Sequence, residues 1–217
     1  RAVPRKVPGR MRSNLNMERI AITGAPGVGK STVCRNVLKE LTCRYGGMIS
    51  ADIRENGERV GFEIKDIATG KRGILAHKKG TGPRVGSYHV NLADLNDIGV
   101  AAIRNALNLE LVVIDEIAPM EFKSPVFVKA VEEALNSRKD MLVVLHQKSG
   151  HPLAERIRRE FLIFTVTPGN RENLVKEIAD KIEKKQVILL RNCGFMLGPG
   201  DSNPEELFKI TNRPTFL

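Results

Sequence analysis

Cysteine is scarce in this chain of 217 residues. Its three cysteines, Cys34, Cys43 and Cys193, are odd in number and lack the spacing of metal ligands, which argues against a disulfide framework and a structural zinc site. We therefore expect reduced thiols in a cytoplasmic protein, with Cys34 as a small core residue.

Long apolar runs are absent as well. No run approaches the ~18 residues of a membrane helix, and the first residues lack the apolar segment of a signal peptide. We expect no membrane contact. The hydrophobic content of 41% is nevertheless sufficient for the core of one medium-sized α/β domain.

Acidic residues are missing before Glu18, whereas residues 1–16 contain five of the 35 basic residues. The remaining 30 basic and 25 acidic residues leave the body only mildly basic although the net charge is +10. The charge distribution thus allows a nucleic-acid partner but does not favour one.

We predict that residues 1–16 are a flexible basic arm, or a remnant of cloning or of overextended upstream sequence. A single domain at 17–190, which we expect to be monomeric, and an irregular tail at 191–217 would follow.

The most informative feature present is a complete G-x-x-x-x-G-K-[ST] phosphate-binding loop. It lies between the apolar segment Ile20-Ala21-Ile22 and a helix-compatible segment, Thr32 to Leu41, which is the context that the motif requires. Its glycines let successive N–H groups point at phosphates. Lys30 would reach the β- and γ-phosphates, and the Ser31 hydroxyl would ligate Mg²⁺. The predicted phosphate-binding residues are Gly24, Ala25, Pro26, Gly27, Val28, Gly29, Lys30, Ser31 and Thr32.

An antiparallel insertion is predicted after the first helix. Two alternating segments, 48–54 and 59–66, flank Asn56-Gly57, which is a strong hairpin signal. A third strand at 73–76 and an exposed mobile loop at 77–87 follow.

Strands and helices then alternate, which predicts a mainly parallel sheet with helices on both faces. Together with the phosphate loop, this pattern indicates the α/β fold of phosphate-loop NTPases. The predicted helices are 93–107, a helix that starts after Ser124-Pro125, 152–159 and one around 174–182, and the predicted buried strands are 111–114, 141–145 and 162–166.

Asp115-Glu116 directly follows the predicted strand 111–114. Groups at the carboxyl ends of parallel strands converge on one ligand crevice, so Asp115 is expected to meet the metal that Ser31 binds. Glu116, one residue further, is a candidate to orient or deprotonate the attacking water. His146, after strand 141–145, is a candidate sensor of phosphate or water.

Stabilising cations are also required around the γ-phosphate, but spacing alone selects none of them. The candidates are Arg84, Lys123, Arg138 and Arg156.

Residues 115–122, Asp-Glu-Ile-Ala-Pro-Met-Glu-Phe, resemble the D-E-[IV]-G-x-M-E-[LF] signature of a small nucleoside-triphosphatase family found in archaea, bacteria and eukaryotes. The resemblance covers roughly residues 17–185. Further segments resemble the family pattern in the same order, namely 59–62, 84–88, 151–153 and 170–171.

The resemblance implies slow, Mg²⁺-dependent hydrolysis of nucleoside triphosphates such as ATP and GTP to diphosphate and phosphate, with broad base tolerance. It implies Lys30 and Glu116 as catalytic residues, Ser31 and Asp115 at the metal, and Asn170 and Arg171 beside the base. The chain departs from the signature at Ala118 and Pro119. A kinase that uses the same loop is the main alternative, and a regulatory nucleotide switch is the third.

Overall fold

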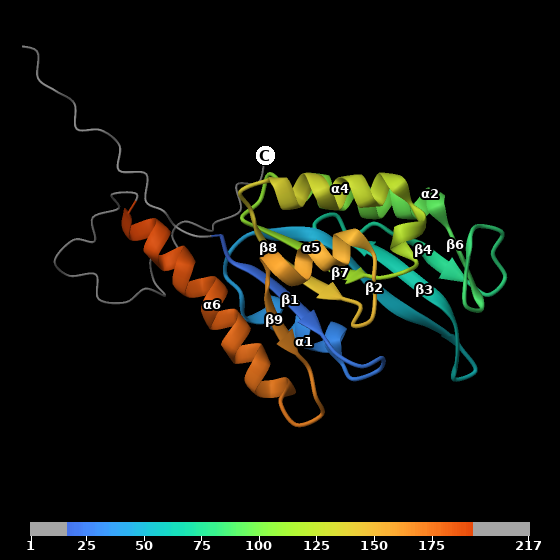
Figure 1. Cartoon of the computed structure of the whole chain (residues 1–217), viewed down its shortest axis with the longest axis horizontal. Coiled ribbons are helices and arrows are strands. Elements are labelled where there is room, and N and C mark those ends of the chain that lie inside the picture. Colours follow the sequence, from blue (N-terminus) through green and yellow to red (C-terminus); the bar gives the residue numbers. More distant parts are fainter. Residues whose placement is uncertain (1–16, 193–217) are drawn as a thin grey trace, which may run out of the picture.

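A nine-stranded sheet with helices on both faces forms the body of the molecule in this computed structural model, which describes residues 17–192 (Figure 1). The strand order is β5-β6-β4-β3-β2-β7-β8-β1-β9. The strands are β1 (Arg19–Thr23), β2 (Tyr45–Glu55), β3 (Glu58–Asp66), β4 (Arg72–His77), β5 (Arg84–Val85), β6 (Tyr88–Val90), β7 (Leu111–Ile117), β8 (Asp140–Leu145) and β9 (Leu162–Thr165). The helices are α1 (Lys30–Glu40), α2 (Leu92–Asp94), the π-helix η1 (Leu95–Val100), α3 (Ala101–Ala106), the 3₁₀-helix η2 (Glu121–Lys123), α4 (Pro125–Asn136), α5 (Pro152–Glu160) and α6 (Arg171–Asn192).

The parallel half of the sheet contains β2, β7, β8, β1 and β9 in this spatial order. Alternate residues of its strands face two separate cores, as the two-residue period of a strand requires. Ile20 and Ile22 pack with α1 and α6, whereas Ala21 packs with α4 and α5 on the opposite face. Because both faces are covered, these strands are continuously apolar in sequence.

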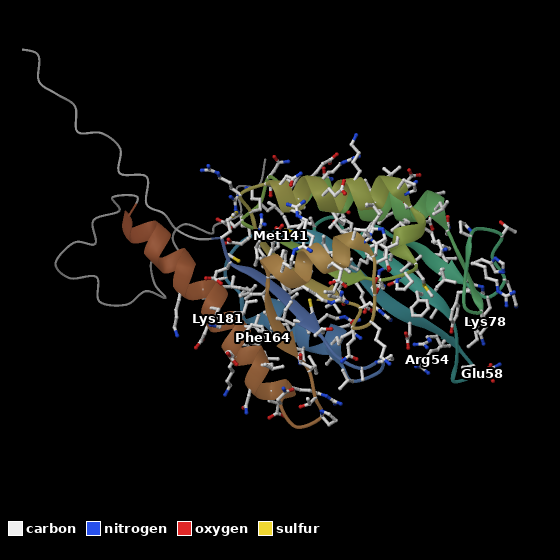
Figure 2. All side chains as sticks on the ribbon, viewed as in Figure 1. Arg54, Glu58, Lys78, Met141, Phe164 and Lys181 are labelled. Atoms are coloured by element: carbon white, nitrogen blue, oxygen red, sulfur yellow. The ribbon has the colours of Figure 1, made fainter. Side chains whose placement is uncertain are left out.

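An antiparallel extension, β3 to β6, is attached to β2. Asn56 and Gly57 at the β2–β3 turn both have positive φ (49° and 83°), as a two-residue hairpin turn of type I′ requires. The predicted hairpin is therefore confirmed. At the tip of the extension, Lys78 pairs with Glu58 at 3.8 Å, and Figure 2 shows both side chains there near Arg54.

Two segments differ from the sequence prediction. The segment 77–87, expected as an exposed mobile loop, is largely exposed but contains β5 and packs closely on β6, since a Cβ at Gly82 would lie 1.9 Å from the Val90 carbonyl oxygen. The helix predicted at 93–107 is divided into α2, η1 and α3. Gly99 of η1 lies close to the sheet, where a Cβ would come within 2.7 Å of Ile64.

The predicted terminal segments can be compared with the structure only in part. α6 continues to Asn192, two residues into the predicted tail, and the rest of the tail, Cys193 and the arm at 1–16 lie outside the described residues. Cys34 is buried in the core as predicted. No helix within residues 17–192 is both long and apolar enough to span a membrane.

Candidate active site

The phosphate loop connects β1 to α1. Gly24, Gly27 and Gly29 have φ values of 146°, 74° and 100°, which residues that carry a side chain rarely adopt. At Gly24 a Cβ would also lie 2.8 Å from the Val166 carbonyl oxygen. No side chain caps the first N–H groups of α1, so the helix N-terminus can donate to an anion.

Ser31 and Asp115 meet although 84 positions separate them. The Ser31 hydroxyl donates to Asp115 Oδ1 at 2.8 Å. Asp115 is completely buried, and burial raises its pKa to about 7. Its other oxygen, Oδ2, has no hydrogen-bond partner among the described residues. An unsatisfied buried oxygen beside a hydroxyl suits a divalent cation.

This pair fits Mg²⁺ in particular. Among residues 17–192, no group of three or more His, Cys, Asp or Glu side chains could hold a metal by itself. Mg²⁺ does not need such a cage, because it is usually bound by one or two protein oxygens, water and substrate phosphates.

Glu116 faces the phosphate loop from β7. Its Oε1 lies 3.7 Å from the Lys30 ammonium, and both side chains are largely shielded, with 23% and 10% exposed. Burial raises the pKa of Glu116, and the neighbouring Lys30 and His146 oppose this rise. Both acidic residues belong to β7 itself, which runs to Ile117, so the prediction that they follow the strand is corrected.

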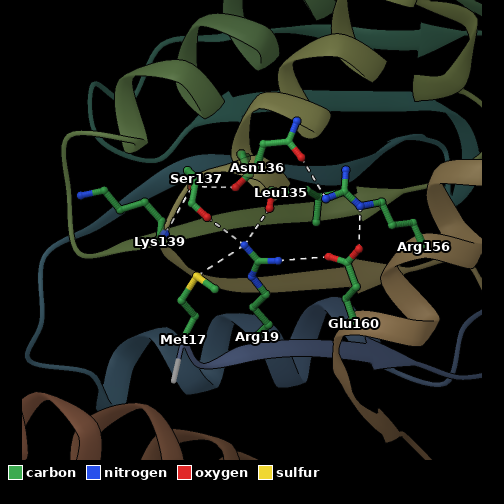
Figure 3. Close-up of polar contacts among 9 residues, drawn as sticks. Met17, Arg19, Leu135, Asn136, Ser137, Lys139, Arg156 and Glu160 are labelled. Atoms are coloured by element: carbon green, nitrogen blue, oxygen red, sulfur yellow. Dashed lines mark hydrogen bonds and ion pairs between the residues drawn. The ribbon is translucent and has the colours of Figure 1, made fainter. Parts of the chain in front are cut away.

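Two of the predicted cations lie at the wrong edge of the sheet. Arg156 donates to Glu160 at 2.7 Å and to Asn136 at 2.9 Å, in a cluster around Arg19 at the amino end of β1 (Figure 3). Arg138 lies between α4 and the amino end of β8. The phosphate loop follows the carboxyl end of β1, so neither arginine can serve the γ-phosphate within this chain.

The other two predicted cations have different surroundings. Arg84 lies on the outermost strand, β5, and donates to the Gly86 carbonyl at 2.8 Å. Lys123 is exposed in η2, which follows β7 at the carboxyl edge. Of the four candidate cations, Lys123 is thus the one that comes soonest after β7 along the chain.

Sequence reasoning missed Arg35, one helical turn after Ser31. Its guanidinium donates to the Ser50 carbonyl at 3.0 Å, and its charge favours the ionised form of Asp115. The four-residue spacing from Ser31 on a helix is the signal that could have identified it.

Glu121 is a second missed residue. It is 2% exposed, and one of its carboxyl oxygens has no partner in the described part of the chain. Burial raises the pKa of Glu121 well above its usual value, while the backbone N–H groups of Glu121 and Ala118 oppose the rise and the charge of Glu116 adds to it. The folded protein therefore holds the proton of the Glu121 carboxyl group more tightly than the unfolded chain does.

We predict that Glu121→Gln makes stability less dependent on pH. Wild type should lose stability as the pH rises from the unfolded pKa (~4.3) towards the raised folded pKa, by about 1.4 kcal/mol per pH unit. The glutamine amide oxygen can still accept backbone N–H bonds but has no proton to lose. Urea denaturation without Mg²⁺ at pH 5 and pH 8 measures the difference, and equal pH slopes for both proteins would contradict the prediction.

A groove of about 1080 Å³ lies between α1 and α6, next to the phosphate loop. Thr32, Asn36 and Arg171 are among its lining residues. The Arg171 side chain lies over the loop, since a Cβ at Gly29 would come 3.3 Å from its Nε. This groove has the position and size to hold a nucleoside whose phosphates occupy the loop.

Asn170 is engaged in the turn before α6. Its Oδ1 accepts the Thr167 N–H at 2.8 Å, and its Nδ2 donates to the Thr165 carbonyl at 3.0 Å. Of the two predicted base-side residues, Arg171 thus lines the groove, whereas the amide of Asn170 shapes the turn.

Comparisons with known proteins agree with this geometry. A family model described as NTPase matches residues 19–179. The nucleoside-triphosphatase THEP1 of Methanosarcina acetivorans is 54% identical over 173 residues, which cover 78% of this chain and 99% of that protein. The protein of the same name from Thermotoga petrophila is 41% identical, over 74% of this chain and 90% of its own.

Two solved structures are similar to this one over about three quarters of the chain. The crystal structure of THEP1 from Aquifex aeolicus has a TM-score of 0.68 and 30% identity, and covers 76% of this chain and 98% of its own. The solution structure of a human cancer-related nucleoside triphosphatase has a TM-score of 0.65 and 29% identity, with coverages of 77% and 98%.

Proposed function

This chain belongs to the NTPase family and hydrolyses nucleoside triphosphates, and we propose that it does so with Mg²⁺ between the phosphate loop and Asp115-Glu116. The observation that carries the proposal is the Ser31–Asp115 contact of 2.8 Å, together with the unsatisfied Asp115 Oδ2. Ser31 and Asp115 would hold the ion. When bound, Mg²⁺ would neutralise charge on the β- and γ-phosphates.

Glu116 is our candidate for the base that prepares the attacking water. It lies beside Lys30 and is poised, by burial, to accept a proton more readily than an exposed carboxylate. A triphosphate in the loop would offer Lys30 a stronger anionic partner than Glu116, which would leave the Glu116 carboxylate free to accept the proton of a water molecule. A carboxylate in this position could also accept the proton of an acceptor hydroxyl, so the preference for hydrolysis over transfer is supported by the nucleoside-triphosphatase relatives.

The groove between α1 and α6 is our candidate nucleoside site. Arg171, whose side chain lies over Gly29, can stack its guanidinium plane on any nucleobase. Stacking does not read base edges, so it supports broad base tolerance. A site that hydrogen-bonded one base edge could discriminate by ~10⁴-fold instead.

We also expect a cytoplasmic monomer that acts on free nucleotides. Cys34 and Cys43 are buried free thiols, as a reducing compartment requires. Five of the ten excess positive charges lie in the first 16 positions, so residues 17–217 are only mildly basic and offer limited electrostatic attraction to nucleic acid.

The test follows the γ-phosphate of ATP, GTP, CTP and UTP labelled at that position. With Mg²⁺ we expect free phosphate from all four, with specificity constants of ATP and GTP within about tenfold of each other. Chelation of Mg²⁺ should abolish the release, because Ser31 and Asp115 alone supply no positive charge for the phosphates.

The control repeats the reaction with nucleosides, nucleoside monophosphates and other small hydroxyl compounds present. Label that appears on an acceptor, with little free phosphate, would mean that the kinase alternative is right. Discrimination between ATP and GTP near 10⁴-fold would contradict the stacking role of Arg171 but not hydrolysis itself.

A further inference from the structure

His146 stands between the two halves of the site. It follows β8, which lies between β1, the strand before the phosphate loop, and β7, the strand that contains Asp115 and Glu116. Its backbone N–H donates to the Ile117 carbonyl of β7 at 3.1 Å. On the other side, the Thr23 hydroxyl of β1 donates to the carbonyl of the preceding Leu145 at 3.1 Å. Both neighbouring strands therefore fix the position of His146.

The hydrogen bonds of the loop also determine which ring nitrogen of His146 can donate. Nδ1 accepts the backbone N–H of Lys148 at 3.3 Å, so the hydrogen of the neutral ring lies on Nε2. The side chain is half-buried, and no described residue hydrogen-bonds its Nε2. His146 thus presents one N–H donor at the carboxyl end of β8, next to the strand that contains Glu116.

Arg158 of α5 holds the loop after His146 in place. Its guanidinium donates to the carbonyls of His146, Gln147 and Ser149 at 3.2, 3.1 and 2.8 Å. At the end of the loop, His151 stacks on Phe122 with ring centroids 3.9 Å apart and accepts the Leu153 N–H as the N-cap of α5. A donor on so constrained a loop is preorganised, which makes its hydrogen bond to a charged group effective.

We propose that Nε2–H of His146 donates a hydrogen bond to the γ-phosphate, so that His146 distinguishes bound triphosphate from diphosphate. The inference rests on the proposed site, in which the γ-phosphate lies between Lys30 and Glu116. Glu116, on the neighbouring strand β7, already has Lys30 as its ion-pair partner at 3.7 Å. The γ-phosphate is the next strong acceptor that substrate binding would bring to this position.

The test compares binding of Mg²⁺–ADP and of the non-hydrolysable ATP analogue AMP-PNP with Mg²⁺, alongside turnover of ATP. His146→Ala should weaken AMP-PNP binding about tenfold to a hundredfold, because a hydrogen bond to a charged acceptor contributes about this factor to affinity. Binding of ADP, which has no γ-phosphate, should stay unchanged. Turnover should fall as well. His146→Gln, whose amide can donate from nearly the same position, should restore much of the discrimination.

His77→Ala is the matched control. His77 likewise accepts a backbone N–H at Nδ1, from Lys79 at 3.1 Å, but it lies on β4 in the antiparallel extension, so the ratio of AMP-PNP to ADP affinity should not change. Equal losses of both affinities in His146→Ala would reduce His146 to a packing residue and overturn the inference. Unchanged affinities with slower turnover would overturn it in favour of an action on Glu116. Failure of wild type to release phosphate, with AMP-PNP still preferred over ADP, would count against the proposed function alone.

Discussion

Replacing Glu116 with glutamine should slow phosphate release by about 10²–10⁴-fold, while binding of the Mg²⁺–triphosphate persists or becomes tighter. Glutamine keeps the size of the side chain and can still orient water, but it cannot accept a proton. It also removes the negative charge 3.7 Å from Lys30, which frees the ammonium for the phosphates. Single-turnover phosphate release and equilibrium binding of AMP-PNP separate the two effects.

Glu132→Gln provides the control, because Glu132 is exposed on α4 and remote from the loop. It should behave as wild type in both assays. Asp115→Asn should differ from Glu116→Gln by raising the Mg²⁺ concentration that activity requires. If Glu116→Gln hydrolyses ATP at the wild-type rate, Glu116 is not the base, and the alternatives of a kinase or a nucleotide switch gain support.

Lys30→Ala should remove most triphosphate affinity and lower kcat/KM by about 10²–10³-fold or more. The backbone N–H groups of the loop would remain, but the charge on the β- and γ-phosphates would lose its only lysine partner within the motif. The variant also leaves the largely buried Glu116 without its ion pair. Thermal unfolding of the variant therefore accompanies the kinetic measurement.

Lys129→Ala is the corresponding control, since this lysine is exposed on α4. A Lys30→Ala protein that is folded and still turns over at nearly the wild-type rate would show that the phosphates bind elsewhere. If Lys30→Ala loses both triphosphate affinity and folding, Lys30→Met separates the two effects, because methionine retains much of the apolar stem of lysine.

The predictions for Glu116→Gln and Lys30→Ala both depend on the ion pair between these two side chains. Lys30 begins α1, after the loop that follows β1, whereas Glu116 belongs to β7, and β8 lies between these two strands. The two side chains nevertheless come within 3.7 Å of each other. A triphosphate bound there would compete with Glu116 for Lys30. Substrate binding and release of the base are thus coupled through one ion pair.

Local sequence patterns determined much of this molecule. The phosphate loop depends on residues within nine positions, because the positive φ angles of Gly24, Gly27 and Gly29 are a property of glycine itself. The Asn56-Gly57 hairpin was predictable for the same reason. The apolar period of the helices and the continuous apolar strands identified a covered parallel sheet without any knowledge of long-range contacts.

The meeting of Asp115 and Ser31 was predictable from sequence, because the carboxyl ends of parallel strands converge on one crevice. Only the tertiary structure decided which other distant side chains share the site, since strand order and helix packing placed Arg156 and Arg138 at the opposite edge. Arg35, Glu121 and the constrained donor of His146 became visible only once helices and strands were packed together. Sequence separation carries no information on such contacts, because they arise from the pairing and packing of whole elements and not from the conformational preference of any one residue.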